Sequence, residues 1–397
     1  MSKNFSKIFL GTTLVCIILL TTGIFLINKE DVLLEDVYGD RQELGNMTVV
    51  YQKTKGLYET NEVNITKDKI WQDKFVKEGT EGFDLSEKNL DNRDLLKYVV
   101  SKSDLCEDED EIATFSLMNT YLTNNESEMT ACIDIKNKET KESQYYEIPV
   151  ENNIDTKGNT DYRAIPVKYK DNIYLTVLSS VYDEDTYEEN SSKSTYNETY
   201  LTLYKINLSM ESSQIILSKS YDGKEIYTDG SMGFSNGDKS YFITKKKSGK
   251  SYITSLFGFN VKTKEITEVE LDLNNYNISD YSLDDNKVLL SCIPKNKNNM
   301  IRSVLVDLNK NKAIKTIDTD MEDEYDKDVI SIDREDGKLY LILGDSSNDE
   351  EMNSGETNSK IKYYIYVIDE KTNKDLYRGE ITEKNMYNIK FGILKQD

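Results

Sequence analysis

The residues of this chain with the most chemistry to offer are carboxylates, which gather in three segments. These run from 182 to 199, from 318 to 328 and from 344 to 360. Carboxylate oxygens are ligands that Ca²⁺ prefers. We predict candidate calcium ligands in "DTDMEDEYDKD", at Asp318, Asp320, Glu322 and Asp326. No segment has EF-hand spacing, so each would supply only part of a coordination shell and calcium would bind weakly. The alternative is a set of solvated loops.

Composition excludes the commonest catalytic arrangements. The chain has 0 His, which removes histidine general bases, histidine triads and histidine metal ligands. Its sequence also lacks a glycine-rich phosphate loop and a G-x-S-x-G nucleophile motif. Asp and Glu number 72, so the paired carboxylates of a glycoside hydrolase cannot be chosen by spacing. A surface hydrolase with such a pair stays open as the alternative function, and we expect no cofactor apart from weakly bound calcium.

The four cysteines give no metal or redox motif. Cys16 lies in an apolar run, and Cys106, Cys132 and Cys292 are far apart without C-x-x-C spacing. A disulfide between Cys106 and Cys132 and a set of buried, inert thiols are both compatible with this pattern.

The N-terminus predicts a membrane anchor. "IFLGTTLVCIILLTTGIFLI", residues 8–27, carries no charge, and such a run spans about 30 Å as a helix, which matches the hydrocarbon core of a bilayer. Lys3 and Lys7 precede it, and acids follow it between 30 and 36. We therefore expect residues 1–7 in the cytoplasm, an uncleaved single-pass anchor in the cell membrane and an extracellular bulk. A cleaved signal peptide is the alternative, although no small-residue cleavage pattern is present.

The remaining sequence is strongly acidic. The whole chain has a formal net charge of −22, which repels phosphate backbones and argues against nucleic acid as a partner. Residues 28–46, "NKEDVLLEDVYGDRQELGN", read as a charged stalk. The segment 85–100 is the one plausible short helix beyond the stalk.

One pattern repeats along the rest of the chain. A polar turn followed by a strand-forming run occurs in "YKDNIYLTVL", "SNGDKSYFIT", "LDDNKVLLSC" and "REDGKLYLIL". A short strand precedes each phrase, and a variable loop, a second long strand, a tight turn and a last strand follow it. Four strands thus recur every 50–65 residues or so, roughly the period of known propeller repeats.

A repeating four-stranded antiparallel unit is typical of a β-propeller, because one unit cannot bury both of its faces. We predict an all-β domain at 47–397, a β-propeller of about six or seven four-stranded blades behind one N-terminal transmembrane helix. The last strand, 387–395, should pair with strands near 47–66 and remove exposed edges. The three acidic segments would then open on one face. A sandwich or a β-solenoid is the alternative.

The start of the domain, "EDVYGDRQELGNMTVVYQ", and the abundance of Lys, Asn and Ile resemble single-pass, membrane-anchored β-propeller-like proteins of low-GC Gram-positive bacteria. This resemblance covers residues 47–397 at the level of pattern and implies no activity. We expect an extracytoplasmic binding or scaffold module that presents an acidic face to a protein or cell-wall partner, and the lack of catalytic motifs favours this over an enzyme.

Overall fold

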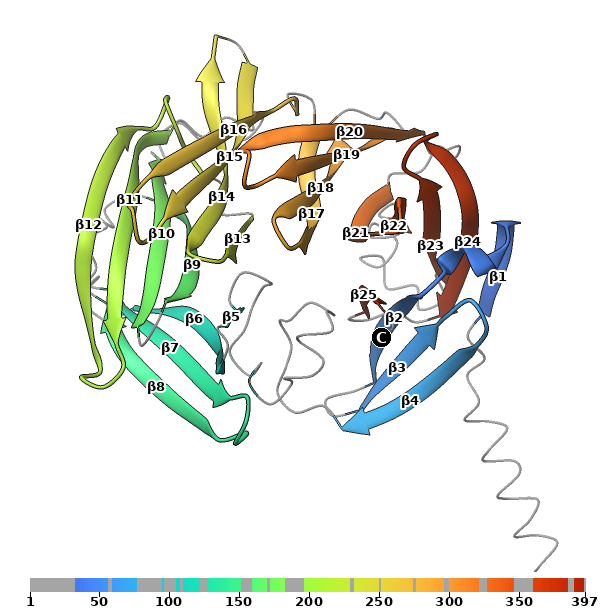
Figure 1. The fold of residues 1–397 in the computed structure, drawn as a ribbon, viewed down its shortest axis with the longest axis horizontal. Coiled ribbons are helices and arrows are strands. Elements are labelled where there is room, and N and C mark those ends of the chain that lie inside the picture. Colours follow the sequence, from blue (N-terminus) through green and yellow to red (C-terminus); the bar gives the residue numbers. More distant parts are fainter. Residues whose placement is uncertain are drawn as a thin grey trace, which may run out of the picture.

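The fold consists of β-strands joined by turns. The computed structural model describes residues 33–55, 59–76, 95, 105–107, 110–121, 127–150, 159–169, 172–182, 196–228, 232–249, 251–273, 276–295, 300–320, 327–345, 360–384 and 389–395. These residues form six antiparallel sheets, five of four strands and one of five. The sheets follow one another around the middle of the molecule (Figure 1). The predicted all-β class and the repeating four-stranded unit are therefore confirmed.

We number the sheets in chain order. The first sheet contains β2 (Met47–Lys55), β3 (Glu59–Ile65), β4 (Ile70–Val76) and β25 (Ile389–Lys395). The second contains β5 (Leu105–Glu107), β6 (Glu111–Tyr121), β7 (Ser127–Asn137) and β8 (Ser143–Val150). The third contains β9 (Asn159–Tyr169), β10 (Asn172–Tyr182), β11 (Tyr196–Asn207) and β12 (Ser212–Asp222).

The remaining three sheets repeat the same order of strands. The fourth contains β13 (Gly233–Asn236), β14 (Lys239–Ser248), β15 (Ser251–Asn260) and β16 (Ile266–Leu271). The fifth contains β17 (Tyr276–Asp284), β18 (Lys287–Pro294), β19 (Met300–Asp307) and β20 (Lys312–Asp320). The sixth contains β21 (Lys327–Glu335), β22 (Lys338–Asp345), β23 (Lys360–Asp369), β24 (Lys374–Lys384) and, outside β24, β1 (Leu33–Gly39).

One kind of turn fixes the register of the outer strands. In five sheets the third strand ends on an Asn or Asp whose side chain accepts hydrogen bonds from backbone N–H groups of the turn; these residues are Asn137, Asn207, Asn260, Asp307 and Asp369. Four positions later the backbone has a positive φ, at Lys141, Glu211, Lys264, Asn311 and Asn373. Short polar side chains favour such turns because they replace a backbone acceptor.

Apolar clusters lie between consecutive sheets. The third and fourth sheets, for example, meet through Leu178, Leu203 and Phe257. Similar clusters join the second sheet to the third, the fourth to the fifth, the fifth to the sixth and the sixth to the first. Because each fully buried apolar side chain contributes about 1.5–3 kcal/mol relative to exposure, the stability of a sheet depends on its neighbours.

Both ends of the described chain connect the last sheet to the first. β25 pairs with β2, with Lys395 opposite Met47 and Ile389 opposite Lys53. This confirms the predicted pairing of the last strand with the start of the domain. The interpretation of residues 28–46 as a stalk needs correction: from Leu33 onward the chain pairs with β24 as β1. A short 3-10 helix (η1, Arg41–Leu44) follows, and Leu44 is buried in the core between the sixth and first sheets.

A group of side-chain hydrogen bonds holds β1 on β24. The Asp36 carboxylate accepts hydrogen bonds from Arg41 at 2.9 and 2.6 Å and from the Tyr377 hydroxyl at 2.6 Å. The hydrogen bond from Arg41 is the main reason that the pKa of Asp36 lies below its usual value. Gly39 has a φ of +74°, and a Cβ there would lie 2.0 Å from the Leu376 carbonyl oxygen. Only glycine allows the two strands to approach this closely.

Four strands at or next to the outer edges of the sheets carry β-bulges with apolar residues. Pairing skips Ile216 in β12, Ile314 in β20, Leu376 in β24 and Val37 in β1. A bulge increases local twist and makes a strand edge a poorer template for pairing with another chain.

The predicted anchor and helix fall in parts of the sequence that the structure leaves undescribed. Among the described residues no helix has the length and apolar character needed to cross a bilayer, and residues 8–27 lie outside them. So does the segment 85–100, except for Leu95, which is buried.

Candidate functional site

One predicted calcium ligand, Asp318, is bound to a cation of the protein itself. Asp318 on β20 lies opposite Arg302 on β19, and the guanidinium donates two hydrogen bonds to its carboxylate at 2.7 and 2.9 Å. Hydrogen bonding to Asp318 also raises the pKa of Arg302. A carboxylate bound in this two-pronged way has its charge compensated.

Of the other predicted ligands, the structure describes only Asp320. Asp320 is exposed at the end of β20, and Glu322 and Asp326 lie outside the described residues. Within the described ranges no group of three or more Cys, Asp or Glu side chains is placed to hold a metal ion. Calcium binding by the acidic segments therefore stays a prediction.

Arg302 has further partners that extend this corner of the fifth sheet. It donates a hydrogen bond to the Asp272 carbonyl at 3.0 Å, and its guanidinium lies 4.6 Å from the ring centre of Tyr276. A guanidinium stacked on an aromatic ring and bound to a carboxylate is held in one orientation. Arg302 thus links the residue that follows β16 to the first residue of β17.

A further acidic segment, "CEDEDE" at residues 106–111, forms ion pairs with lysines. Glu107 lies 2.9 Å from Lys138, and Glu111 lies 2.8 Å from Lys168. Lys168 belongs to β9 of the third sheet and its side chain is only 5% exposed. The second of these ion pairs therefore links two neighbouring sheets.

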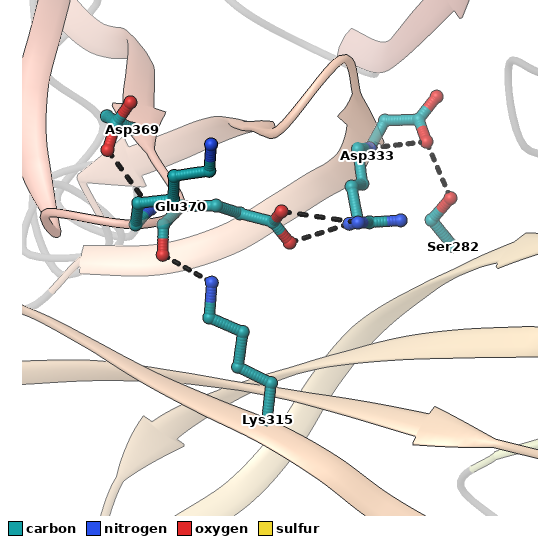
Figure 2. A network of polar contacts seen from close by, with 7 residues as sticks. Ser282, Lys315, Asp333, Asp369 and Glu370 are labelled. Atoms are coloured by element: carbon teal, nitrogen blue, oxygen red, sulfur yellow. Dashed lines mark hydrogen bonds and ion pairs between the residues drawn. The ribbon is translucent and has the colours of Figure 1, made fainter.

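A larger polar network lies where the fifth and sixth sheets meet (Figure 2). Arg334 at the end of β21 donates to both carboxylate oxygens of Glu370, at 2.6 and 3.2 Å. Glu370 is buried in the turn after β23, and its backbone carbonyl accepts a hydrogen bond from Lys315 of β20. Ser282 of β17 donates to Asp333 at 2.7 Å. Two polar contacts thus join the fifth sheet to the sixth.

The same network continues into the first sheet. Lys395 of β25 lies 2.6 Å from Glu335, and Lys338 of β22 lies 2.7 Å from Glu43 of η1. Polar residues of three consecutive sheets are therefore connected at one end of their strands.

Inner strands of the fifth and sixth sheets contact each other directly. Ser279 of β17 donates to the Val329 carbonyl at 2.6 Å, and Asp280 accepts from the Ile332 amide at 3.1 Å. Pairing skips Ser279 and Ile330 at this level, so a bulge in each strand accompanies these contacts.

The three described cysteines are unfavourable for thiol chemistry. Cys106, Cys132 and Cys292 are buried thiols, so the considered disulfide between the first two is not formed. Burial raises the pKa of Cys292 to about 12. Since the thiolate is the nucleophile, a thiol with this pKa is unreactive near neutral pH.

Trp71 lies on β4, the outermost strand of the first sheet. Its indole N–H donates to Asp73 at 3.1 Å, and the Lys69 ammonium lies 4.5 Å from the ring centre. The ring packs at the rim of the sheet with a lysine over one face.

Comparisons with known proteins add little. No family model matches the chain, and no curated protein matches it. Among solved structures, the one titled "Structure of YjhT" matches with a TM-score of 0.33 and 10% identity, over 68% of this chain and 82% of that chain. A likeness at this TM-score is too low to support a conclusion about function.

Proposed function

We propose that this protein is a membrane-anchored, extracytoplasmic binding module whose six sheets are the blades of one propeller. Residues 8–27 hold it in the membrane with the N-terminus in the cytoplasm, and a protein or cell-wall partner binds its acidic loops. The pattern of its sequence resembles that of anchored proteins from low-GC Gram-positive bacteria, and we propose such an origin.

The observation that carries this proposal is the uneven distribution of acidic and basic residues. Described carboxylates such as Asp318, Glu111 and Glu370 are bound to cations of the protein. In contrast, the sequence between β10 and β11 and that between β22 and β23 are rich in acids and contain few lysines. Both connect second strands to third strands, so they leave their sheets at corresponding ends. A partner with basic groups would be attracted to that end.

Ring closure needs one more contact. The five apolar clusters link the second sheet through to the sixth and the sixth back to the first. Contact between the first and second sheets would complete a six-bladed ring, and the pairing of β25 with β2 supports such closure because it uses the edge that β2 would otherwise expose.

The test uses the chain in its own membrane. Chemical cross-linking on intact cells should join the protein to its partner, and replacing Asp183, Glu184 and Asp185 by Asn, Gln and Asn should reduce the cross-linked yield at least fivefold. The control variant is Glu139→Gln. Glu139 lies in the turn between β7 and β8, at the opposite end of the strands. Equal yields for both variants and the unaltered protein would rule out the acidic loops as the binding surface.

A further inference from the structure

The rim of the sixth sheet carries two adjacent exposed apolar residues. Val37 is 45% exposed and Tyr38 is 54% exposed, and both lie on β1, the outermost strand. Adjacent residues of a regular strand point to opposite faces, but Val37 is the extra residue of a bulge. A bulge re-aims side chains, and both of these side chains are exposed at adjacent positions of the strand.

Chain length keeps this rim near the anchor. Only residues 28–32 separate the apolar run 8–27 from Leu33, the first residue of β1. Even a fully extended chain covers no more than about 20 Å over that stretch. Val37 is four residues further along the strand, about 13 Å away.

The chemistry of the rim suits the surface of a bilayer. Tyr is enriched at the membrane–water interface because its ring is apolar and its hydroxyl polar. Beside it, Asp36 is turned toward Tyr377 and Arg41, and its charge is compensated there. Anionic lipid would repel the strongly acidic domain. A short tether, however, raises the effective concentration of the rim at the membrane.

We propose that Val37 and Tyr38 dock β1 on the lipid surface that carries the anchor. This rests on the proposed function, since it requires residues 8–27 to span the membrane. In the docked state the sixth sheet lies beside the lipid headgroups. The third sheet, on the opposite side of the molecule from β1 in Figure 1, points away from the membrane.

Tryptophan fluorescence of the full-length protein tests this docking. The chain has 1 Trp, so the Trp71→Phe variant has no tryptophan fluorescence of its own. Tyr38→Trp or Val37→Trp is added to it, and the protein is placed in vesicles of zwitterionic lipid with or without brominated acyl chains. The matched control is Met210→Trp, at a residue that is 73% exposed in the turn between β11 and β12.

Docking predicts that brominated lipid quenches the fluorescence of both rim probes at least twofold and leaves the Met210→Trp probe unchanged. Equal quenching at all three positions, or quenching at none, overturns it. Flotation of the vesicles distinguishes failure of the docking from failure of the proposed membrane anchor. Protein that stays at the bottom of the gradient contradicts the anchor and the proposed function, whereas protein that floats with unquenched rim probes contradicts the docking alone.

Discussion

Arg334 and Glu370 show how single residues are used at the joint between the fifth and sixth sheets. The pair has two hydrogen bonds, Glu370 is buried, and the pKa of Arg334 is raised by its bond to Glu370. Removing one partner leaves the other charge buried without compensation, which is more costly than losing the hydrogen bonds alone.

We therefore expect Arg334→Gln to lower the free energy of unfolding by about 2 kcal/mol. Urea denaturation of the purified protein measures this. The matched control is Lys310→Ala, because Lys310 is 74% exposed and pairs with Asp307 at the surface, where such pairs contribute about 0–1 kcal/mol. A loss for Arg334→Gln no greater than that for the control would show that the network does not stabilise the joint.

The lowered pKa of Asp36 predicts that the stability of the folded state depends on pH. Its pKa is lowered in the folded state, chiefly by Arg41, so the folded state favours the carboxylate. The resulting stability is present above the unfolded pKa of about 3.9 and is lost as pH falls through the folded value.

Asp36→Asn should accordingly lower the melting temperature at pH 7, and the difference from the unaltered protein should shrink as the pH falls below the unfolded pKa of about 3.9. Paired melting curves across this range check the prediction. A difference that stays constant from pH 7 to pH 3 would mean that the charge of Asp36 has no part in holding β1.

At the scale of elements, much of the fold is predictable because turn chemistry and strand patterning agree. The strand predicted in "YKDNIYLTVL" corresponds to β10, and the strands predicted before and after it correspond to β9, β11 and β12. Turns such as "NKNK" lie where the positive-φ residue Asn311 is needed. Local residues decide these features, so a single sequence reveals them.

Local sequence patterns could not predict the features that depend on residues far away in the chain. "LLEDVYG" is rich in charge and predicts a stalk, yet it pairs with β24, more than 330 residues away, through Tyr377 and the carbonyl of Leu376. The phrase "REDG" contains Arg334 but predicts only a turn, since Glu370 lies in another turn of the same sheet. No local sequence pattern marks Arg302. The one available signal is that arginine is a rare residue in this chain.

β25 provides a prediction at this scale. Deleting residues 389–397 removes the inner strand of the first sheet, with Phe391 and Ile393 that pack in its core, and leaves the inner edge of β2 unpaired. We expect a loss of several kcal/mol of unfolding free energy and a tendency to aggregate through the exposed edge. Calorimetry and gel filtration measure both effects, and a truncated protein that melts at the temperature of the full chain would contradict this closure.

For the whole molecule, charge dominates the expected response to ions. Acidic loops concentrate negative charge, whereas Asp318 is already bound to Arg302. A divalent cation would relieve repulsion among the loops without a complete coordination shell. We expect a small rise in melting temperature at millimolar calcium, matched by magnesium. Melting curves with sodium chloride as an ionic-strength control decide; a large shift at micromolar calcium that Asp320→Asn removes would reveal a specific site.

The central claim is that a binding domain is held outside the cell by an uncleaved anchor, and labelling of intact cells tests it most directly. Met210→Cys places a thiol at a residue that is 73% exposed, whereas Cys106, Cys132 and Cys292 are buried. With Cys16 replaced by Ser in both proteins, a membrane-impermeant maleimide should label the Met210→Cys variant in intact cells as fully as after lysis, on a protein whose mass includes residues 1–27, and should leave the parent protein unlabelled. Labelling that appears only after lysis, or a mature chain that begins near Asn28, would contradict the account.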